Sequence, residues 1–393
     1  MAQALVNSRL LIGRKLVTGQ AVIIESGRID SVVAEEEVPA ECDTVDLGGH
    51  LLVPGFIDTQ VNGGGDRLFN DDPSVEAIAA IGRAHRRFGT TGFLPTLISD
   101  DEGKIAAAID AARMAIAAGV PGVLGVHIEG PFLNPAKKGI HDPTKLRPIS
   151  NSDIDLLTRR SGGKTMVTLA PEAVPADAIR RLASAGVVVS AGHTQASADQ
   201  IFEALRNGVR GFTHLFNAMS QLTAREPGVV GAALYDENSW CGIIVDGHHV
   251  DSRVLKIALR ATPHRRFMLV TDAMPSVGGR KAFMLNGEPI SAAGGKCVNA
   301  QGTLAGSDLD MASAVRNAVA MLGLDVTHAL AMASANPAAF LGLEDELGRI
   351  APGYRANLVL LDSGLDVVES WIDGERAGTL GADGVQRGRM VRG

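Results

Sequence analysis

Glu129, His193 and His214 combine residue types and positions that suit a metal ion. Each comes at the end of a short apolar run, where a buried segment of the chain reaches a loop. Two imidazoles and one carboxylate form a ligand set that holds a catalytic divalent cation and leaves a coordination position for water. Each residue alone would read as a hydrogen-bonded buried group, but three such groups at equivalent positions favour a shared metal site.

Asp272 follows another apolar run, at residues 267–270. A metal ion lowers the pKa of a bound water from about 15.7 to about 7. A neighbouring carboxylate can take up that proton and deliver it to a departing nitrogen. We therefore expect Asp272 to act as general base and then as general acid in a hydrolysis. The alternative is that Asp272 caps a helix in the following loop.

The elements that must position these residues are visible as eight short runs of Val, Ile, Leu and Phe, separated by polar loops and Ala-rich stretches of helical period. Continuous apolar runs indicate strands buried on both faces, as in a parallel sheet covered by helices. Eight such units predict a TIM-like (β/α)8 barrel over residues 55–345, with its active site at the carboxyl ends of the strands. The runs begin near Phe56, Thr91, Val123, Thr165, Val187, Gly211, Cys241 and Phe267.

Amphipathic stretches predict the helices of the barrel. Residues 73–88 and 101–118 carry apolar side chains at three- and four-residue spacing. Two further segments of this kind, 308–322 and 326–341, follow the eighth run. Ser307 is the expected N-cap of the first of them.

The two ends of the chain have a different pattern. Residues 1–54 and 346–393 contain short extended pieces separated by turns. Neither end has enough strands for a core of its own. We therefore expect both ends to join in one small β-sandwich domain beside the barrel, which gives an α/β fold class overall.

The composition excludes several classes of protein. The net charge is −7, and no cluster of Lys and Arg with interleaved aromatic residues suggests a nucleic-acid partner. No apolar run reaches the roughly 18 residues of a membrane span, and residues 1–10 lack the pattern of a secretion signal. A cytoplasmic protein without a membrane partner is expected. Cys42, Cys241 and Cys297 are too few and too scattered for a disulfide framework or a thiolate zinc site.

Four short motifs carry a resemblance to a known family. They are VPGFID at 53–58, HIEGPF at 127–132, THLFNAM at 213–219 and LAGS at 304–307. Together they are similar to the N-acetylglucosamine-6-phosphate deacetylases of the amidohydrolase superfamily. The resemblance implies metal-dependent hydrolysis of the acetamide of N-acetylglucosamine 6-phosphate to glucosamine 6-phosphate and acetate, in amino-sugar catabolism or cell-wall recycling. It also implies Glu129, His193 and His214 as metal ligands and Asp272 as the acid and base.

The resemblance further implies which residues hold the 6-phosphate. Arg225 and His249 would do so together with Asn217 and the backbone N–H of Ala218. One or both of Arg225 and His249 would reach across from the other subunit of a homodimer. By itself, Arg225 would read as a surface salt-bridge residue.

The sugar and acetyl contacts are implied in the same way. His141 would contact the sugar or polarise the acetyl carbonyl, although by itself it would read as a loop residue. Leu304, Ala305 and Gly306 would lie in a glycine-rich loop that could move to cover the sugar.

Gln60 and Asn62 stand where many amidohydrolases have a His-x-His pair that binds a second metal. Neutral amide oxygens are poor replacements for imidazole toward a borderline-soft dication. We therefore expect one divalent metal per chain. Zn²⁺ is the first expectation, with Fe²⁺ and Co²⁺ as alternatives, because two His and one Glu suit all three ions.

Three other functions are weighed against this one. The first is a deacetylase for N-acetylgalactosamine 6-phosphate. The second is another amidohydrolase such as a cyclic amidase, which is disfavoured because residues 165–170 contain no Lys. The third is a catalytically inactive barrel that serves as a binding scaffold, with Gln60 and Asn62 as signs of decay. The retention of three candidate ligands and Asp272 speaks against a scaffold.

Overall fold

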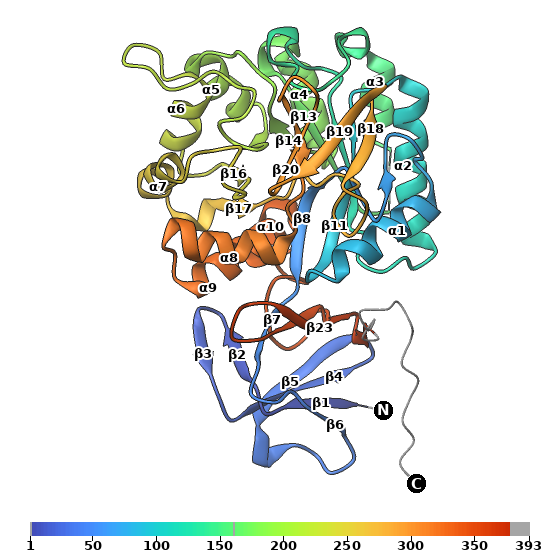
Figure 1. The fold of residues 1–393 in the computed structure, drawn as a ribbon, viewed down its shortest axis with the longest axis vertical. Helices are drawn as coiled ribbons and strands as arrows, with labels where there is room; N and C mark the ends of the chain where they lie inside the picture. The colour runs from blue at the N-terminus through green and yellow to red at the C-terminus, as the bar shows by residue number, and fades with distance from the viewer. Residues whose placement is uncertain (1, 160–161, 378–393) are drawn as a thin grey trace.

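A parallel eight-stranded barrel forms the larger part of the molecule (Figure 1). The computed structural model describes residues 2–159 and 162–377. The strands follow one another in chain order, and all eight predicted apolar runs are strands of the barrel. They are β8 (Phe56–Val61), β11 (Thr90–Ile98), β12 (Gly125–Glu129), β13 (Lys164–Leu169), β14 (Val188–Ala191), β15 (Val209–Phe212), β16 (Trp240–Ile243) and β17 (Phe267–Leu269).

The barrel closes between its first and last strands through contacts just beyond their carboxyl ends. Val61 and Ala273 form a parallel bridge. The N–H of Asp272 donates to the carbonyl oxygen of Gln60 at 3.0 Å. This closure brings the residues that follow β17 against the end of β8, at the mouth of the barrel.

Helices cover the outside of the barrel (Figure 1). Every residue of β8, β11 and β12 is buried, which explains their continuous apolar runs. The helices expected at 73–88 and 101–118 are confirmed as α1 and α2. The helices are α1 (Val75–Arg86), α2 (Glu102–Ala117), α3 (Asn151–Leu157), α4 (Ala176–Ser184), α5 (Ala198–Arg206), α6 (Gly228–Tyr235), α7 (Ser252–Ala261), α8 (Met311–Leu322), α9 (Val326–Ala333) and α10 (Ala335–Leu341).

The predicted N-cap at Ser307 is wrong. Helix α8 begins three residues later than expected, and Asp310 caps it by accepting the N–H of Ser313 at 2.8 Å. The Ser307 hydroxyl instead donates to the carbonyl oxygen of Thr271 at 2.5 Å. Ser307 therefore ties its strand to the segment that carries Asp272.

The single helix expected at 326–341 is two helices. Ser334 separates α9 from α10 with φ −136° and ψ −75°. Pro337 has no N–H to donate to the carbonyl oxygen of Ala333, so an unbroken helix would lose a hydrogen bond there.

A four-stranded antiparallel sheet that the apolar pattern did not predict follows β17. Its strands are β18 (Ala282–Leu285), β19 (Glu288–Ala293), β20 (Lys296–Val298) and β21 (Leu304–Ser307). Leu304, Ala305 and Gly306 therefore lie in a strand paired with β20, and the expectation of a mobile glycine-rich loop at these residues is wrong. Two short antiparallel strands of two residues each, β9 (Gly63–Gly64) and β10 (Arg67–Leu68), lie near the mouth of the barrel.

Strands from both chain ends form two further sheets below the barrel (Figure 1). One has the order β5-β4-β1-β6 and the other the order β24-β23-β22-β7-β2-β3, so the expected joining of the two ends is confirmed. Their strands are β1 (Gln3–Val6), β2 (Arg9–Ile12), β3 (Lys15–Val17), β4 (Gln20–Glu25), β5 (Arg28–Ala34), β6 (Asp43–Asp46), β7 (Leu51–Pro54), β22 (Leu358–Leu361), β23 (Val367–Ile372) and β24 (Glu375–Arg376).

The two sheets share an apolar core. Leu5, Leu10, Val22, Leu358 and Trp371 are buried in it, and they come from both ends of the chain. The domain boundaries at 54/55 and 345/346 stay a prediction, and residues 378–393 of the expected β-domain lie outside the described residues. Within the described chain, no helix is long and apolar enough to span a lipid bilayer.

Candidate active site

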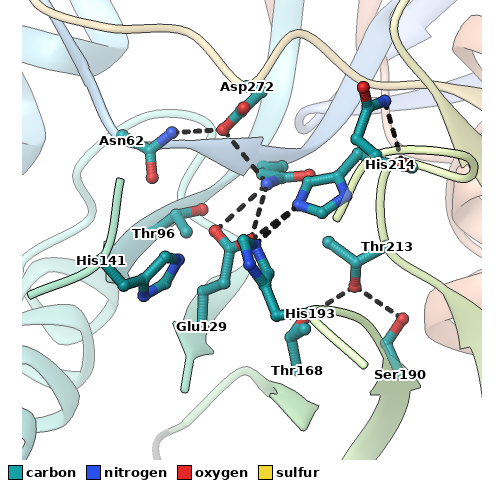
Figure 2. A network of polar contacts seen from close by, with 12 residues as sticks. Asn62, Thr96, Glu129, His141, Thr168, Ser190, His193, Thr213, His214 and Asp272 are labelled. Carbon is teal, nitrogen blue, oxygen red and sulfur yellow. Dashed lines mark hydrogen bonds and ion pairs between the residues drawn. The ribbon is translucent and has the colours of Figure 1, made fainter. Parts of the chain in front are cut away.

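Glu129, His193 and His214 meet at the mouth of the barrel, as the sequence predicted (Figure 2). Glu129 ends β12, and each histidine comes two residues after the end of its strand, His193 after β14 and His214 after β15. Glu129 Oε1 lies 3.1 Å from His193 Nε2 and 3.0 Å from His214 Nε2, and the two ring nitrogens are 3.1 Å apart. All three residues are buried.

The three side chains fit a divalent cation. In a tetrahedral site with bonds of about 2.0 to 2.2 Å, ligand atoms lie about 3.3 to 3.6 Å apart, so the three observed spacings would need to widen by only a few tenths of an ångström. His193 Nδ1 lies 2.8 Å from the carbonyl oxygen of Lys137, which can only accept a hydrogen bond. The proton of a neutral ring therefore sits on Nδ1, and the lone pair of Nε2 is left for a metal.

The backbone at the strand ends turns sharply to aim these residues inward. His193 has φ +50°, His214 has φ +33° and Asp272 has φ +52°. Residues other than glycine rarely adopt positive φ angles. Each such residue costs about 1 to 3 kcal/mol, and residues of this kind cluster at functional sites. Three such residues, after the ends of β14, β15 and β17, indicate that the mouth is built for these side chains.

Asp272 points into the same space and is held by two amides. Its Oδ1 accepts from Gln60 Nε2 at 3.1 Å and from Asn62 Nδ2 at 2.6 Å. Gln60 Nε2 also donates to Glu129 Oε2 at 3.1 Å, so one amide connects both carboxylates. Burial, and then the negative charge of Glu129, raises the pKa of Asp272 to about 6.

The charge on Glu129 is stabilised by its neighbours. Burial raises the pKa of Glu129, but the effect of the close imidazoles of His193 and His214 outweighs it and holds the pKa well below the ordinary value. Burial alone would lower the pKa of His214, but its bond to Glu129 raises the pKa above the ordinary value. The site is therefore suited to an ionised carboxylate.

His141 lies against His193, with ring centroids 4.5 Å apart. Its Nδ1 accepts the backbone N–H of Ser99 at 3.2 Å and lies 2.7 Å from the Ser99 hydroxyl. Since Nδ1 is an acceptor, the proton of the neutral ring is on Nε2. Burial, and then the neighbouring His193, lowers the pKa of His141 to about 3. His141 is thus a neutral hydrogen-bond donor toward the cavity.

A cavity of about 400 Å³ opens over these groups. It brings together most of the predicted site residues: Asn62, Glu129, His141, His193, His214, Asn217, Ala218, His249, Asp272, Leu304 and Gly306. His249 Nδ1 donates to Asp246 Oδ2 at 2.6 Å, which leaves Nε2 for the cavity. Met274, Ile98 and Leu68 add an apolar wall.

Three predicted residues do not line this cavity. Gln60 is buried and donates to Glu129 and Asp272. Arg225 is exposed in the segment that precedes α6. Ala305 is buried in an apolar cluster with Met274 and Cys297. Arg225 could reach a substrate only in a neighbouring subunit, and Ala305 supports the cavity wall through packing. The substrate contacts expected of these two residues stay predictions.

The sequence analysis missed Ser99 and the threonines that contact His127. Ser99 directly follows β11, so the rule that polar residues close barrel strands could have found it. His127 lies below Glu129, with Nε2 2.7 Å from Thr168 Oγ1 and Nδ1 3.3 Å from Thr96 Oγ1. Burial lowers the pKa of His127, and the charge of Glu129 opposes this only in part, so the pKa is about 4. The His127 ring is therefore neutral and packs beneath the site.

Comparisons with known proteins agree with this geometry. Residues 51–381 match the model of the amidohydrolase family, and residues 3–52 match the NagA composite domain. An N-acetylgalactosamine-6-phosphate deacetylase of Shewanella sp. (strain ANA-3) is 46% identical, covering 84% of each chain. An N-acetylglucosamine-6-phosphate deacetylase of Haemophilus influenzae is 33% identical, covering 95% of this chain and 99% of the relative.

Solved structures give the same grouping. The N-acetylglucosamine-6-phosphate deacetylase of Pasteurella multocida superposes with a TM-score of 0.93 at 33% identity, covering 96% of this chain and 100% of that chain. A Mycobacterium smegmatis N-acetyl-D-glucosamine-6-phosphate deacetylase mutant, in complex with N-acetyl-D-glucosamine-6-phosphate, superposes with a TM-score of 0.87 at 33% identity, covering 95% and 99%. The predicted resemblance is confirmed, and the chain belongs to the amidohydrolase family, among its amino-sugar-phosphate deacetylases.

Proposed function

We propose that this chain hydrolyses the acetamide of N-acetylglucosamine 6-phosphate to glucosamine 6-phosphate and acetate. The observation that carries the proposal is one buried cavity that joins a metal-capable Glu/His/His group, a carboxylate with a raised pKa and a neutral imidazole donor. These are the groups that amide hydrolysis needs. N-acetylgalactosamine 6-phosphate is the second candidate substrate, because a relative at 46% identity carries that name.

Glu129, His193 and His214 hold one divalent metal ion in this proposal, with Zn²⁺ as the first expectation and Fe²⁺ or Co²⁺ as alternatives. When bound, such an ion polarises the acetyl carbonyl and lowers the pKa of water. The hydrogen bonds of Gln60 support a single ion. Its Nε2 faces Glu129 and Asp272, where a second cation would meet an N–H donor instead of a lone pair.

Asp272 moves the proton. Gln60 and Asn62 hold Oδ1, whereas Oδ2 accepts no hydrogen bond from the described residues. Oδ2 takes a proton from the attacking water and delivers it to the amide nitrogen as the C–N bond breaks. His141 donates from Nε2 to the acetyl oxygen, where negative charge develops.

His249, Asn217 and the backbone N–H of Ala218 bind the 6-phosphate at the other end of the cavity. Their position in its lining supports this assignment. Arg225 joins them from the neighbouring subunit of a homodimer, and its exposure in the single chain supports that role. Leu304 and Gly306 of β21 cover the sugar, with Ala305 packed behind them.

Steady-state kinetics on the two epimeric N-acetylhexosamine 6-phosphates test the substrate assignment. We expect a higher kcat/KM for N-acetylglucosamine 6-phosphate, with acetate released in equal amount to the free amine. The reverse order would assign the galactosamine epimer. Absence of turnover on both, in metal-loaded protein, would overturn the proposed function.

Removal of one ligand should abolish tight metal binding. Metal-loaded protein should keep one equivalent per chain after dialysis, and Glu129→Gln and His214→Ala should each lower the metal affinity by more than about 100-fold. His50→Ala removes a histidine far from the cavity and should keep the full equivalent. Elemental analysis of the dialysed proteins measures the content. Two retained equivalents in the parent protein would contradict a single site.

Replacement of Asp272 should separate chemistry from metal binding. Asp272→Asn preserves the shape but removes the proton acceptor, so kcat should fall about 10³-fold while the metal content stays. Asp251→Asn, at the exposed cap of α7, is the matched control and should keep kcat. Turnover of Asp272→Asn near the parent rate would end the assignment of Asp272.

Arg225→Ala should weaken binding of the phosphate. A charge-assisted bond to phosphate contributes about 1.5 to 3 kcal/mol, so KM should rise about 10-fold or more with a smaller change in kcat. The slow reaction on unphosphorylated N-acetylglucosamine should stay unchanged. Arg253→Ala removes an exposed arginine elsewhere and is the control. An unchanged KM would exclude Arg225 from the phosphate site.

A further inference from the structure

A second hollow, of about 690 Å³, lies between the barrel and the small sheets. Its walls come from the β2–β3 turn, helices α9 and α10, and the 3-10 turn His264–Arg266 ahead of β17. Figure 1 shows the β2–β3 hairpin directed toward α9. Trp240 also lines the hollow and is the first residue of β16. The hollow is therefore at the amino ends of the strands, opposite the mouth that carries Glu129.

Four arginines line this hollow: Arg14, Arg265, Arg266 and Arg349. Among the described residues, its lining contains no Asp or Glu. Within residues 2–159 and 162–377, the guanidinium groups of Arg14, Arg265 and Arg349 make no hydrogen bond or ion pair. In a chain with a net charge of −7, four arginines that line one hollow, three of them without an acidic partner, point to an anionic ligand.

An adjoining hollow of about 720 Å³ continues the same basic surface. It shares Trp240 and Arg266 with the first hollow and adds Lys164, Arg206 and Arg210, with Asp236 as the acid in its lining. Two of these cations are also held by backbone carbonyls, since Arg266 Nε donates to Glu237 at 3.0 Å and Arg210 Nη2 to Ala339 at 2.8 Å.

Arg266 forms the boundary between the two hollows. Its guanidinium stacks on the ring of Trp240, 4.8 Å from the centroid. Burial, and then repulsion from Arg265, lowers its pKa, as expected for a cation among like charges. An anion bound beside Arg266 would relieve that repulsion.

We propose that these adjoining hollows bind a small metabolite that carries two or more phosphate groups. Guanidinium groups pair with phosphate oxygens through parallel N–H bonds. The cations are distributed over two hollows that meet at Arg266, so they suit several phosphates spaced apart better than one. Each hollow is also larger than the cavity of about 400 Å³ at the mouth.

A bound metabolite of this kind would link the barrel to the small sheets. Arg14 belongs to the turn after β2, whereas Arg265 and Arg349 belong to segments next to the barrel. A ligand that contacts all three arginines binds only the folded chain, so it raises the free energy of unfolding. This site is independent of the proposed reaction, because it lies at the opposite end of the barrel.

Calorimetric titration of metal-loaded protein with fructose 1,6-bisphosphate tests the proposal. Saturating glucosamine 6-phosphate is kept in the solution to compete at the mouth of the barrel. We expect a one-to-one complex and a raised Tm. Arg265→Gln/Arg349→Gln should raise the Kd about 10-fold or more. Arg14→Gln should raise it as well, which gives a second variant if the double variant is unstable.

A charge-matched control separates the site from general electrostatics. Arg83→Gln/Arg113→Gln removes two arginines from α1 and α2 and should change the Kd less than about twofold. All variants should keep the kcat and KM of the parent on the acetylated sugar phosphate. Equal loss in both double variants, or an unchanged Kd in Arg265→Gln/Arg349→Gln, would overturn the proposal. So would binding of a single-stranded oligonucleotide at these arginines without binding of the bisphosphate.

Discussion

The buried carboxylate of Glu129 is the constraint around which the mouth of the barrel is built. A charge removed from water must be matched by neighbouring donors or by a cation. Here both imidazoles approach Oε1, and the amide of Gln60 approaches both oxygens. The same amide reaches Asp272, so it holds two acids in one small space without a direct contact between them.

The histidines around this carboxylate are set by their other ring nitrogen. A carbonyl oxygen fixes the proton of His193 on Nδ1, so Nε2 offers a lone pair. The N–H of Ser99 does the opposite for His141, whose Nε2 carries the proton. Two neighbouring imidazoles thus present different groups to the cavity, one a lone pair and one an N–H, because the backbone offers them opposite partners.

Much of the fold and the site could be predicted from the sequence, because the barrel strands form continuous apolar runs and several of these runs are followed within two residues by a His or an acid. Glu129, His193 and His214 follow from that pattern alone. The sheet β18–β21 could not be predicted in this way, since its strands are short and only partly buried. Its apolar run, Ala282–Leu285, has only four residues and three of them are not buried. Ser307 and Asp310 both suit an N-cap, and only the packing of Ser307 against Thr271 decides between them. The tautomer of His141 depends on Ser99, which is 42 residues away in sequence.

The pairing of β7 with β2 on one side and β22 on the other has a consequence for how the chain is made. During synthesis, the amino-terminal strands leave the ribosome with one flank of β7 unpaired, and its partner arrives only after the whole barrel has been translated. The barrel can close before that, because all eight of its strands lie between these two segments. Until β22 pairs with β7, that edge of β7 is open to pairing with other chains.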